Sequence, residues 1–224
     1  MEPVFSRAEA RAYDRHCMGP LGIPGILLME RAARGCAAAA LEMLSATPRP
    51  PQASVVVVCG PGQNGGDGYA VASMLVEAGH AVAVRAVGVP REGTDAASMR
   101  ARAEAAGVAI AEFDARERGQ RFDLVVDALL GTGLDREVAG DPRAAIEWMN
   151  TLGAPILSID LPSGMDCDTG EPMPVCVRAT RTVTMVAAKL GFFRPVARPN
   201  LGVVEVVPIG GPDPAPFSRS AAPG

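Results

Sequence analysis

Residues Val55–Gly68, with the sequence VVVVCGPGQNGGDG, decide the fold class of this chain. A run of β-branched residues leads into a loop that holds five glycines, and an apolar-periodic segment then predicts a helix over 67–78. A buried strand that feeds a glycine loop and a helix presents free backbone N–H groups to an anionic ligand. The stretch therefore predicts an α/β protein with such a ligand at this loop.

The alternation of strand and helix patterns continues along the chain. Because the strands are short and almost entirely apolar, they predict a doubly wound, Rossmann-like, mostly parallel sheet with helices on both faces, a three-layer αβα architecture. We expect one domain over 1–210 and a proline-rich, disordered tail over 211–224. The predicted strands are 54–59, 81–88, 108–112, 123–128, 155–160, 181–187 and 202–207. The predicted helices begin at Ser6, Pro24, Asp67 and Asp95, and a fifth is capped by Asp141.

Composition excludes several classes of protein. With 224 residues and a net charge of -4, the chain lacks the excess of cations that binding to nucleic acid or anionic membranes requires. Its five cysteines form no metal-ligand spacing, which is typical of reduced thiols. The first residues lack the apolar core of a signal peptide, and no apolar run is long enough to span a membrane. We therefore expect a cytoplasmic protein.

Three polar loops each follow a predicted strand directly: Gly60–Gly68, Gly131–Glu137 and Asp160–Gly170. Asp127 and Asp160 each stand at the end of an apolar strand. In an open parallel sheet the carboxyl ends of all strands lie at the same edge, so these loops should border one crevice. The sequence thus predicts a site at this edge of the sheet.

The side chains of that edge favour a hard cation. Asn64, Asp127, Asp160 and Ser163 offer only oxygen ligands, which suit an alkali or alkaline-earth ion and not zinc or copper. A single aspartate at a strand end can equally be structural, receiving backbone N–H bonds from the next turn. Two of them facing an asparagine and a serine favour a functional role.

A redox dinucleotide site is the first alternative, since Gly60, Gly62 and Gly65 satisfy the G-x-G-x-x-G pattern. The acid that would hold a ribose hydroxyl is absent from the end of the second strand, VRAVGVPRE, which argues against a nicotinamide-dependent oxidoreductase. Lys189 is the only lysine among 21 basic residues. A compact ammonium is not interchangeable with a guanidinium, so this residue is a candidate functional group.

These motifs together resemble the NAD(P)H-hydrate epimerases, also called the YjeF N-terminal domain family. The resemblance rests on LLMERAA, CGPGQNGGDGYAVASML, DLVVDALLGTGLDREVAG, ILSIDLPSGMDCDTGE and TVTMVAAKLGFF, which together span nearly the whole chain. It implies an isomerase that interconverts the 6R and 6S hydrates of NADH and NADPH, with K⁺ as the cofactor. It also implies a separate ATP- or ADP-dependent dehydratase that acts on the product, and a homodimer.

The resemblance also implies roles for individual residues. Asn64, Asp127 and Ser163 would ligate potassium, and Asp160 would contact the reacting end of the substrate. We expect Asp160 to act in catalysis as the acid or the stabilising anion, with Lys189 as a proton donor or phosphate anchor. The residues expected to contact phosphates and ribose are Gln63, Asn64, Gly65, Gly66, Asp67, Gly131, Thr132, Gly133, Leu134, Asp135, Arg136 and Glu137.

Two departures from the family pattern keep other functions open. Gln63 replaces the first of two usual asparagines, and Arg31 stands where the MENAG signature has asparagine. Arg31 adds a cation near the expected crevice, where it would bind a phosphate or alter the choice of substrate. The alternatives are a non-catalytic nucleotide-binding or scaffold domain of the same fold, and an isomerase or hydro-lyase for another small metabolite.

Overall fold

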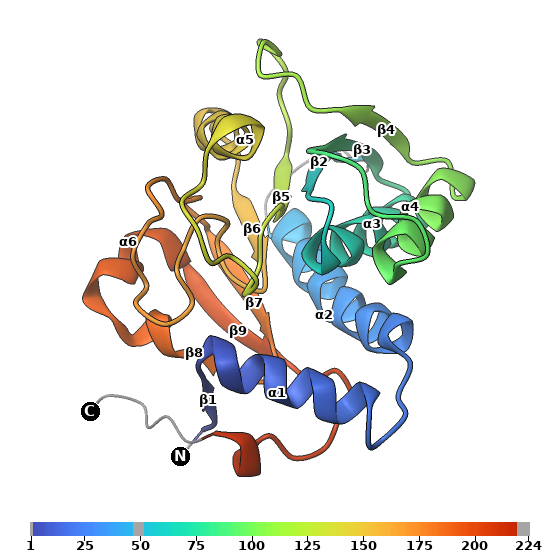
Figure 1. Cartoon of the computed structure of the whole chain (residues 1–224). Helices are drawn as coiled ribbons and strands as arrows, with labels where there is room; N and C mark the ends of the chain where they lie inside the picture. The colour runs from blue at the N-terminus through green and yellow to red at the C-terminus, as the bar shows by residue number, and fades with distance from the viewer. Residues whose placement is uncertain (1, 47–51, 219–224) are drawn as a thin grey trace.

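The computed structural model describes residues 2–46 and 52–218. Its centre is a seven-stranded sheet in the order β4-β3-β2-β5-β6-β7-β9, and every neighbouring pair of strands is parallel. The doubly wound α/β class is therefore confirmed (Figure 1). The strands are β2 (Ser54–Cys59), β3 (Ala81–Ala86), β4 (Ala109–Glu112), β5 (Leu124–Ala128), β6 (Ile156–Ile159), β7 (Arg181–Met185) and β9 (Val203–Val207).

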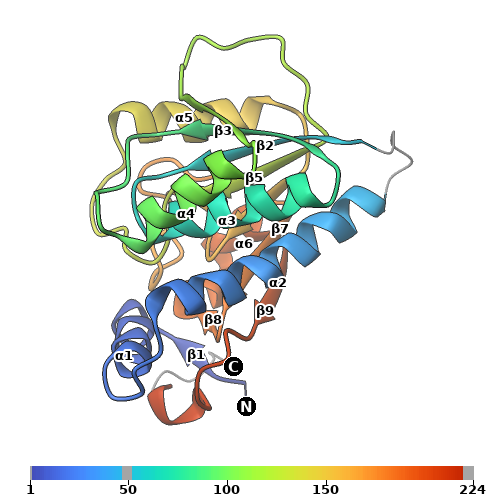
Figure 2. The same cartoon turned by 90° about the vertical axis from the view of Figure 1, so that its right-hand side faces the viewer.

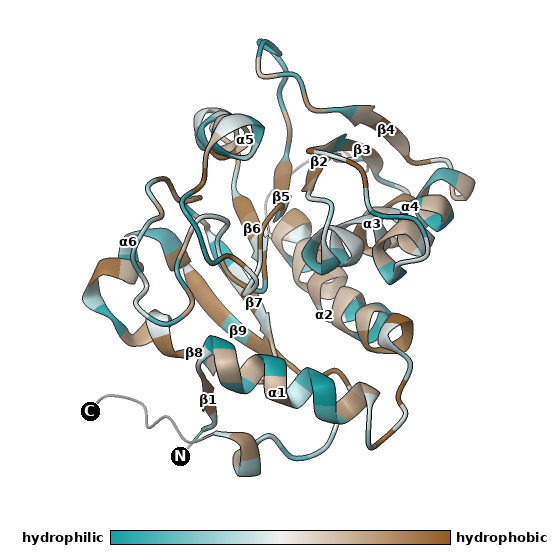
Figure 3. Ribbon diagram, viewed as in Figure 1, coloured by the Kyte–Doolittle hydropathy of each residue, from teal (hydrophilic) through white to brown (hydrophobic). Residues whose placement is uncertain are grey.

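Helices cover both faces of the sheet, which gives the predicted three layers (Figure 2). Three helices, α2 (Gly25–Ser45), α3 (Gln63–Glu77) and α4 (Asp95–Ala105), pack on one face, and α5 (Gly140–Thr151) packs on the other. Strand β2 explains the arrangement, because its consecutive valines alternate between the two apolar cores. In Figure 3 the central strands are coloured mostly as hydrophobic, whereas the helices carry both hydrophobic and hydrophilic residues.

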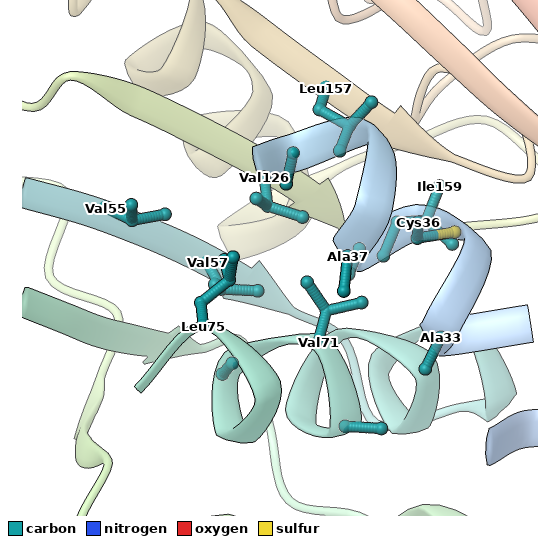
Figure 4. Close-up of a cluster of buried hydrophobic side chains, with 14 of the residues drawn as sticks. Ala33, Cys36, Ala37, Val55, Val57, Val71, Leu75, Val126, Leu157 and Ile159 are labelled. Carbon is teal, nitrogen blue, oxygen red and sulfur yellow. The ribbon is translucent and has the colours of Figure 1, made fainter. Parts of the chain in front are cut away.

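The core between α2, α3 and the sheet is built from small side chains on α2. Ala33, Cys36 and Ala37 are buried there against Val71 and Leu75 of α3 (Figure 4). Because these α2 side chains are short, the helix approaches both its neighbour helix and the strands closely. The approach places the start of α3 at the carboxyl edge of the sheet.

Helix α3 begins at Gln63, four residues before its predicted start at 67, so Gly65 and Gly66 lie in its first turn. The glycines allow this start because there is no room for side chains. A Cβ on Gly65 would lie 1.8 Å from the carbonyl oxygen of Gly60, and one on Gly68 would lie 2.4 Å from Cβ of Ala128. The prediction treated the glycines as loop residues because helix propensity alone disfavours them.

The remaining elements include predicted helices and several short elements that were not predicted. Helix α1 (Arg7–Met18) has the predicted capping box between Ser6 and Glu9. It follows β1 (Val4–Phe5), which pairs with β8 (Ala188–Lys189) in a separate parallel sheet. Short helical turns η1 (Leu190–Phe193), η2 (Pro195–Ala197), α6 (Arg198–Leu201) and η3 (Ala215–Phe217) complete the chain. Helix α5 is capped by Ala139, and Asp141 lies within its first turn.

The expected disordered tail is wrong for residues 211–218, which pack against α1. The Tyr13 hydroxyl donates to the Pro212 carbonyl over 2.9 Å, and the Phe217 ring lies edge-on to Tyr13 with centroids 5.2 Å apart. Ser218 Oγ accepts from the Val4 N–H at 3.0 Å. Residues 219–224 lie outside the described residues. Within the described chain, no helix has the length and apolarity to cross a membrane.

The start of α3 yields a stability prediction. Gly65→Ala should lower the free energy of unfolding by about 3 kcal/mol, because the added methyl meets backbone that cannot move away cheaply. Gly133→Ala is the matched control, since no heavy atom lies within 4 Å of its added Cβ. Urea unfolding followed by circular dichroism measures both changes. Equal stability of the two variants would contradict the described packing.

Candidate active site

The three polar loops meet at a single cleft of about 540 Å³ at the carboxyl edge of the sheet. The start of α3, the loop after β5 and the loop after β6 line its inner side, and α1 closes its outer side. The predicted site residues that line this cleft are Gln63, Asn64, Asp67, Gly131, Thr132, Gly133, Leu134, Asp135, Arg136, Asp160 and Lys189. The convergence expected from parallel strand topology is therefore present.

Asp160 is held in the cleft by a cation and a backbone N–H. Its Oδ1 lies 3.2 Å from Nζ of Lys189, and its Oδ2 accepts from the Thr132 N–H over 2.8 Å. The residue has φ of 70°, a strained conformation for a side chain other than glycine. Its N–H donates to the Val183 carbonyl of β7 over 2.8 Å, which ties the strained turn to the sheet. Ammonium and N–H both stabilise negative charge on Asp160.

Lys189 is buried, with only 2% of its surface exposed. Its ammonium donates to Oγ1 of Thr184 over 2.7 Å and to the carbonyls of Ala187 and Met185 over 3.1 and 3.2 Å. Three acceptors therefore hold the three N–H bonds of the ammonium beside Asp160. An ammonium held in this way is suited to anchoring the Asp160 carboxylate. It is less suited to carrying a proton to a substrate.

Asn64 is the clearest indication of a ligand-binding position. Both polar atoms of its side-chain amide are buried, and neither has a hydrogen-bond partner among the described residues. Leaving such groups unpaired costs about 1–3 kcal/mol each, which an open ligand position would explain. The amide adjoins Asp160 through Gly131, since a Cβ on Gly131 would lie 2.8 Å from Oδ2 of Asp160 and 3.3 Å from Cγ of Asn64.

Asp127 lies fully buried behind the cleft and does not line it. Its Oδ2 accepts from the Ser163 N–H and from the Ser158 hydroxyl, each over 2.8 Å. Its Oδ1 accepts from the Ser163 hydroxyl over 2.5 Å and from the Leu129 N–H over 3.3 Å. Burial raises the pKa of Asp127, although these hydrogen bonds oppose the shift. No described Lys or Arg side chain forms an ion pair with it.

These groups fit a hard monovalent cation better than a transition metal. No cluster of three or more His, Cys, Asp or Glu side chains within 2–46 and 52–218 could hold a metal ion. The available ligands are a buried amide oxygen, a buried carboxylate and the Ser163 hydroxyl, all hard oxygens. One stretch of backbone, residues 129–131, connects these ligands. The Leu129 N–H donates to Asp127, and the Leu130 N–H donates to the Ser163 hydroxyl. Gly131 lies next to the Asn64 side chain.

Asp67 is a second buried carboxyl of the cleft, 6% exposed. No described residue forms a hydrogen bond or an ion pair with its side chain. Burial raises its pKa well above the ordinary value, and the like charges of Asp160 and Asp14 raise it further. Asp14 of α1 also lines the cleft, and its own pKa is raised by burial and by Asp160.

Arg7 joins α1 to two of the three site loops. Its Nε donates to the Thr132 carbonyl over 3.1 Å, and its guanidinium pairs with Oδ2 of Asp166 over 2.6 Å. Its own N–H donates to Oδ1 of Asp168 over 2.8 Å. Since the N–H of Thr132 holds Asp160, Arg7 braces the peptide that positions the carboxylate. Sequence reasoning missed Arg7 and Asp14, although the capping box at Ser6 places both on one face of α1, seven residues apart.

Several predicted contact residues lie away from the cleft surface. Gly65 and Gly66 are enclosed in the first turn of α3, where Gly66 packs against Met29, and Glu137 is exposed beyond the lining. The expectation for Arg31 is wrong, because its guanidinium does not line the cleft. It donates instead to the carbonyls of Ile209 and Gly210 over 3.3 and 3.1 Å and fastens the C-terminal segment to α2.

Asp67 gives a prediction on stability against pH. Its folded-state pKa is raised, so the wild-type protein must hold a proton at Asp67 or bear a buried charge as the pH rises above the unfolded value of about 4. Asp67→Asn removes this penalty. The variant should gain stability relative to wild type with rising pH, approaching about 1.4 kcal/mol per pH unit below the folded pKa.

Chemical unfolding at a series of pH values measures this difference. The matched control is Asp141→Asn, which changes an exposed carboxylate on α5. A stability difference between Asp67→Asn and wild type that does not change with pH would show that Asp67 titrates normally.

Comparison with known proteins agrees with this geometry. The NAD(P)H-hydrate epimerase of Rhodopirellula baltica shares 38% sequence identity with this chain. The alignment covers 94% of this chain and 85% of that protein. The NAD(P)H-hydrate epimerase of Limosilactobacillus reuteri (strain ATCC 55730) is 36% identical to 92% of the chain, which covers 94% of it. A bifunctional NAD(P)H-hydrate repair enzyme, Nnr, of Salinibacter ruber is 39% identical to 94% of the chain, but the chain spans only 41% of its length.

A crystal structure of the yeast protein ynu0 has the same fold, with a TM-score of 0.75 at 24% identity over 84% of this chain and 82% of the yeast chain. The family described as YjeF-related protein N-terminus matches residues 25–191, a range that contains the three site loops and Lys189. The chain therefore belongs to the YjeF N-terminal family.

Proposed function

We propose that this protein is an NAD(P)H-hydrate epimerase, an isomerase that interconverts the 6R and 6S hydrates of NADH and NADPH. The observation that carries the proposal is the cleft in which Asp160, Lys189 and the unpartnered Asn64 meet. Two relatives that bear this name match nearly their whole length to the chain.

The cleft offers positions for both ends of a hydrated dinucleotide. Helix α3 has no side-chain cap at its start, so its first backbone N–H groups and its dipole favour a phosphate there. Arg11 and Arg136 line the cleft as further cations for phosphate groups. The hydrated ring would then lie toward Asp160, the acid that Lys189 and the Thr132 N–H hold in place.

The chemistry requires negative charge beside the ring. The hydrated carbon carries a hydroxyl and is bonded to the ring nitrogen, so cleavage of the C–O bond leaves a cation that the nitrogen lone pair stabilises. Water that adds to the opposite face inverts the centre. Asp160, fixed by Lys189 and the Thr132 N–H, supplies an anion that is already oriented when the positive charge develops.

Potassium is the cofactor that we propose, with Asn64, Asp127 and Ser163 as its ligands. When bound, the ion would neutralise a buried carboxylate and strengthen the electrostatic attraction for an anionic substrate. Two observations support this proposal. The Asn64 amide is buried without a hydrogen-bond partner among the described residues. The hydrogen bonds to the Asp127 carboxylate come from hydroxyl and backbone N–H groups, which leave its charge without a cation among the described side chains. Ser163 positions Asp127 through both its hydroxyl and its N–H.

The main observation in favour of a different substrate was Arg31, and it does not reach the cleft. The epimerase is thus the function that the site supports best. The bifunctional relatives support a dehydratase activity as the one that acts on the product. We also propose a cytoplasmic homodimer, for which β9 offers an exposed edge with Val203, Val204 and Val206.

The deciding experiment follows the R/S ratio by chromatography after the separated R hydrate is mixed with the protein. Interconversion should depend on potassium, and replacing it with tetramethylammonium at equal ionic strength should slow the reaction. Asp160→Asn should lower the rate by at least about 100-fold and leave hydrate binding intact, because it removes the anion and keeps the shape. An R/S ratio that wild type leaves unchanged would refute the proposed activity.

Arg7 should act on the rate through the position of Thr132. Arg7→Ala should lower kcat by roughly 10- to 100-fold with a smaller effect on KM, because the peptide that holds Asp160 loses its brace. Arg7→Lys should recover part of the loss, since an ammonium still reaches one acceptor. Arg143→Ala is the control, because that exposed arginine pairs with Glu147 on α5 and does not line the cleft. Unchanged kcat in Arg7→Ala would remove this residue from the site.

A further inference from the structure

Resting on the proposed epimerase activity, we propose that Asp67 is the general acid of the reaction, paired with the anionic Asp160 across one cleft. The acid protonates the departing hydroxyl, and the two carboxyls take unlike roles. This assignment goes beyond the contact to phosphate or ribose that the family resemblance implies for Asp67.

Asp67 lies on the same side of the cleft wall as the residues around Asp160. Asn64 and Asp67 are three residues apart in α3 and therefore project from the same face of the helix. Asn64 adjoins Asp160 at Gly131, and both Asp67 and Asp160 line the cleft. Their charges also act on the same buried thiol, Cys36 of α2. Asp67 thus lies about one helical turn from Asn64, which adjoins Gly131 on the same side as Asp160.

The environments of the Asp67 and Asp160 carboxyls differ. Asp160 has an ammonium and an N–H donor, whereas Asp67 has neither a hydrogen-bond donor nor a cation among the described residues. The ionisable groups that act on Asp67 are Asp160 from the turn after β6 and Asp14 from α1, and both disfavour its ionisation. Burial without a donor or a cation favours the neutral form of Asp67.

Other groups of the cleft that could donate a proton already form hydrogen bonds with the protein. Lys189 gives its N–H bonds to Thr184, Ala187 and Met185. The Tyr13 hydroxyl donates to the Pro212 carbonyl, and burial raises its pKa to about 12. Asp14 on α1 is more exposed than Asp67, and neither histidine lines the cleft. Besides Asp160, Asp67 is the buried carboxyl of the cleft, and burial favours its protonated form.

The proton and electrons balance as follows. The Asp67 carboxyl gives its proton to the hydroxyl oxygen, the C–O bond breaks, and its electron pair leaves with the oxygen as water. The nitrogen lone pair forms the C=N bond of the cationic ring, and Asp67 becomes a carboxylate. A water molecule then adds to the opposite face and gives its proton to Asp160. The two carboxyls exchange this proton with solvent through the mouth of the cleft before the next turnover.

The test combines a titration of the free protein with kinetics. Carbon-13 NMR of protein labelled at aspartate carboxyls, with Asp67→Asn to assign the resonance, should show Asp67 protonated at neutral pH. Asp14→Asn should lower the pH at which it titrates, because a like charge has been removed. In the enzyme, Asp67→Asn should lower kcat at least about 100-fold without loss of hydrate affinity. Wild-type kcat should fall as the pH rises through the Asp67 titration.

Asp141→Asn is the matched control for both measurements, as an exposed carboxylate remote from the cleft. Asn is close in shape to a protonated Asp, so circular dichroism should show Asp67→Asn to be folded. An Asp67 resonance that titrates like an exposed aspartate would overturn the acid assignment, and so would full kcat in Asp67→Asn. A wild-type protein that leaves both hydrates unchanged would overturn the epimerase function itself, whatever the titration of Asp67.

Discussion

No side chain fits where the strand ends of this protein meet, and the site depends on that constraint. A Cβ on Gly60 would lie 2.0 Å from the Leu129 carbonyl oxygen, one on Gly65 would lie 1.8 Å from the Gly60 carbonyl oxygen, and one on Gly131 would crowd Asp160. The missing side chains let α3 start against β2 and β5 and let the loop after β5 touch Asn64. The convergence of Asn64, Gly131 and Asp160 follows from this close approach of backbone to backbone.

The site holds more buried polar groups than stability alone would favour. Asp67 and Asp127 are carboxyls whose burial raises the pKa of each, and the Asn64 amide is buried without a partner. Asp160 adds a strained backbone at φ of 70°. Each of these features costs free energy of folding, and together they concentrate unsatisfied polarity in one cleft. Such a concentration is typical of a binding or catalytic site.

The outer wall of the cleft comes from the two ends of the described chain. Helix α1 brings Arg7 and Asp14 to the site, and residues 211–218 hold α1 through Tyr13 and Phe217. Arg31 fastens the same C-terminal segment to α2. The residue at this position of the signature thus serves the attachment of this wall, and its side chain does not line the cleft.

The sequence by itself determined the class of fold, the three site loops and the edge of the sheet where they gather. Strand patterns are local, and the rule that parallel strands end at one edge converts them into a place. Gln63, Asn64 and Asp160 were accessible to this reasoning because each adjoins a strand or glycine motif, and Lys189 was found as the single lysine of the chain. The tertiary structure alone decided the rest. It enclosed Gly65 and Gly66 in a helix, turned Arg31 away, folded 211–218 and gave Asp67 and Asp160 unlike surroundings. These outcomes depend on contacts between segments distant in sequence, and neither local propensity nor residue type encodes which partner a side chain meets.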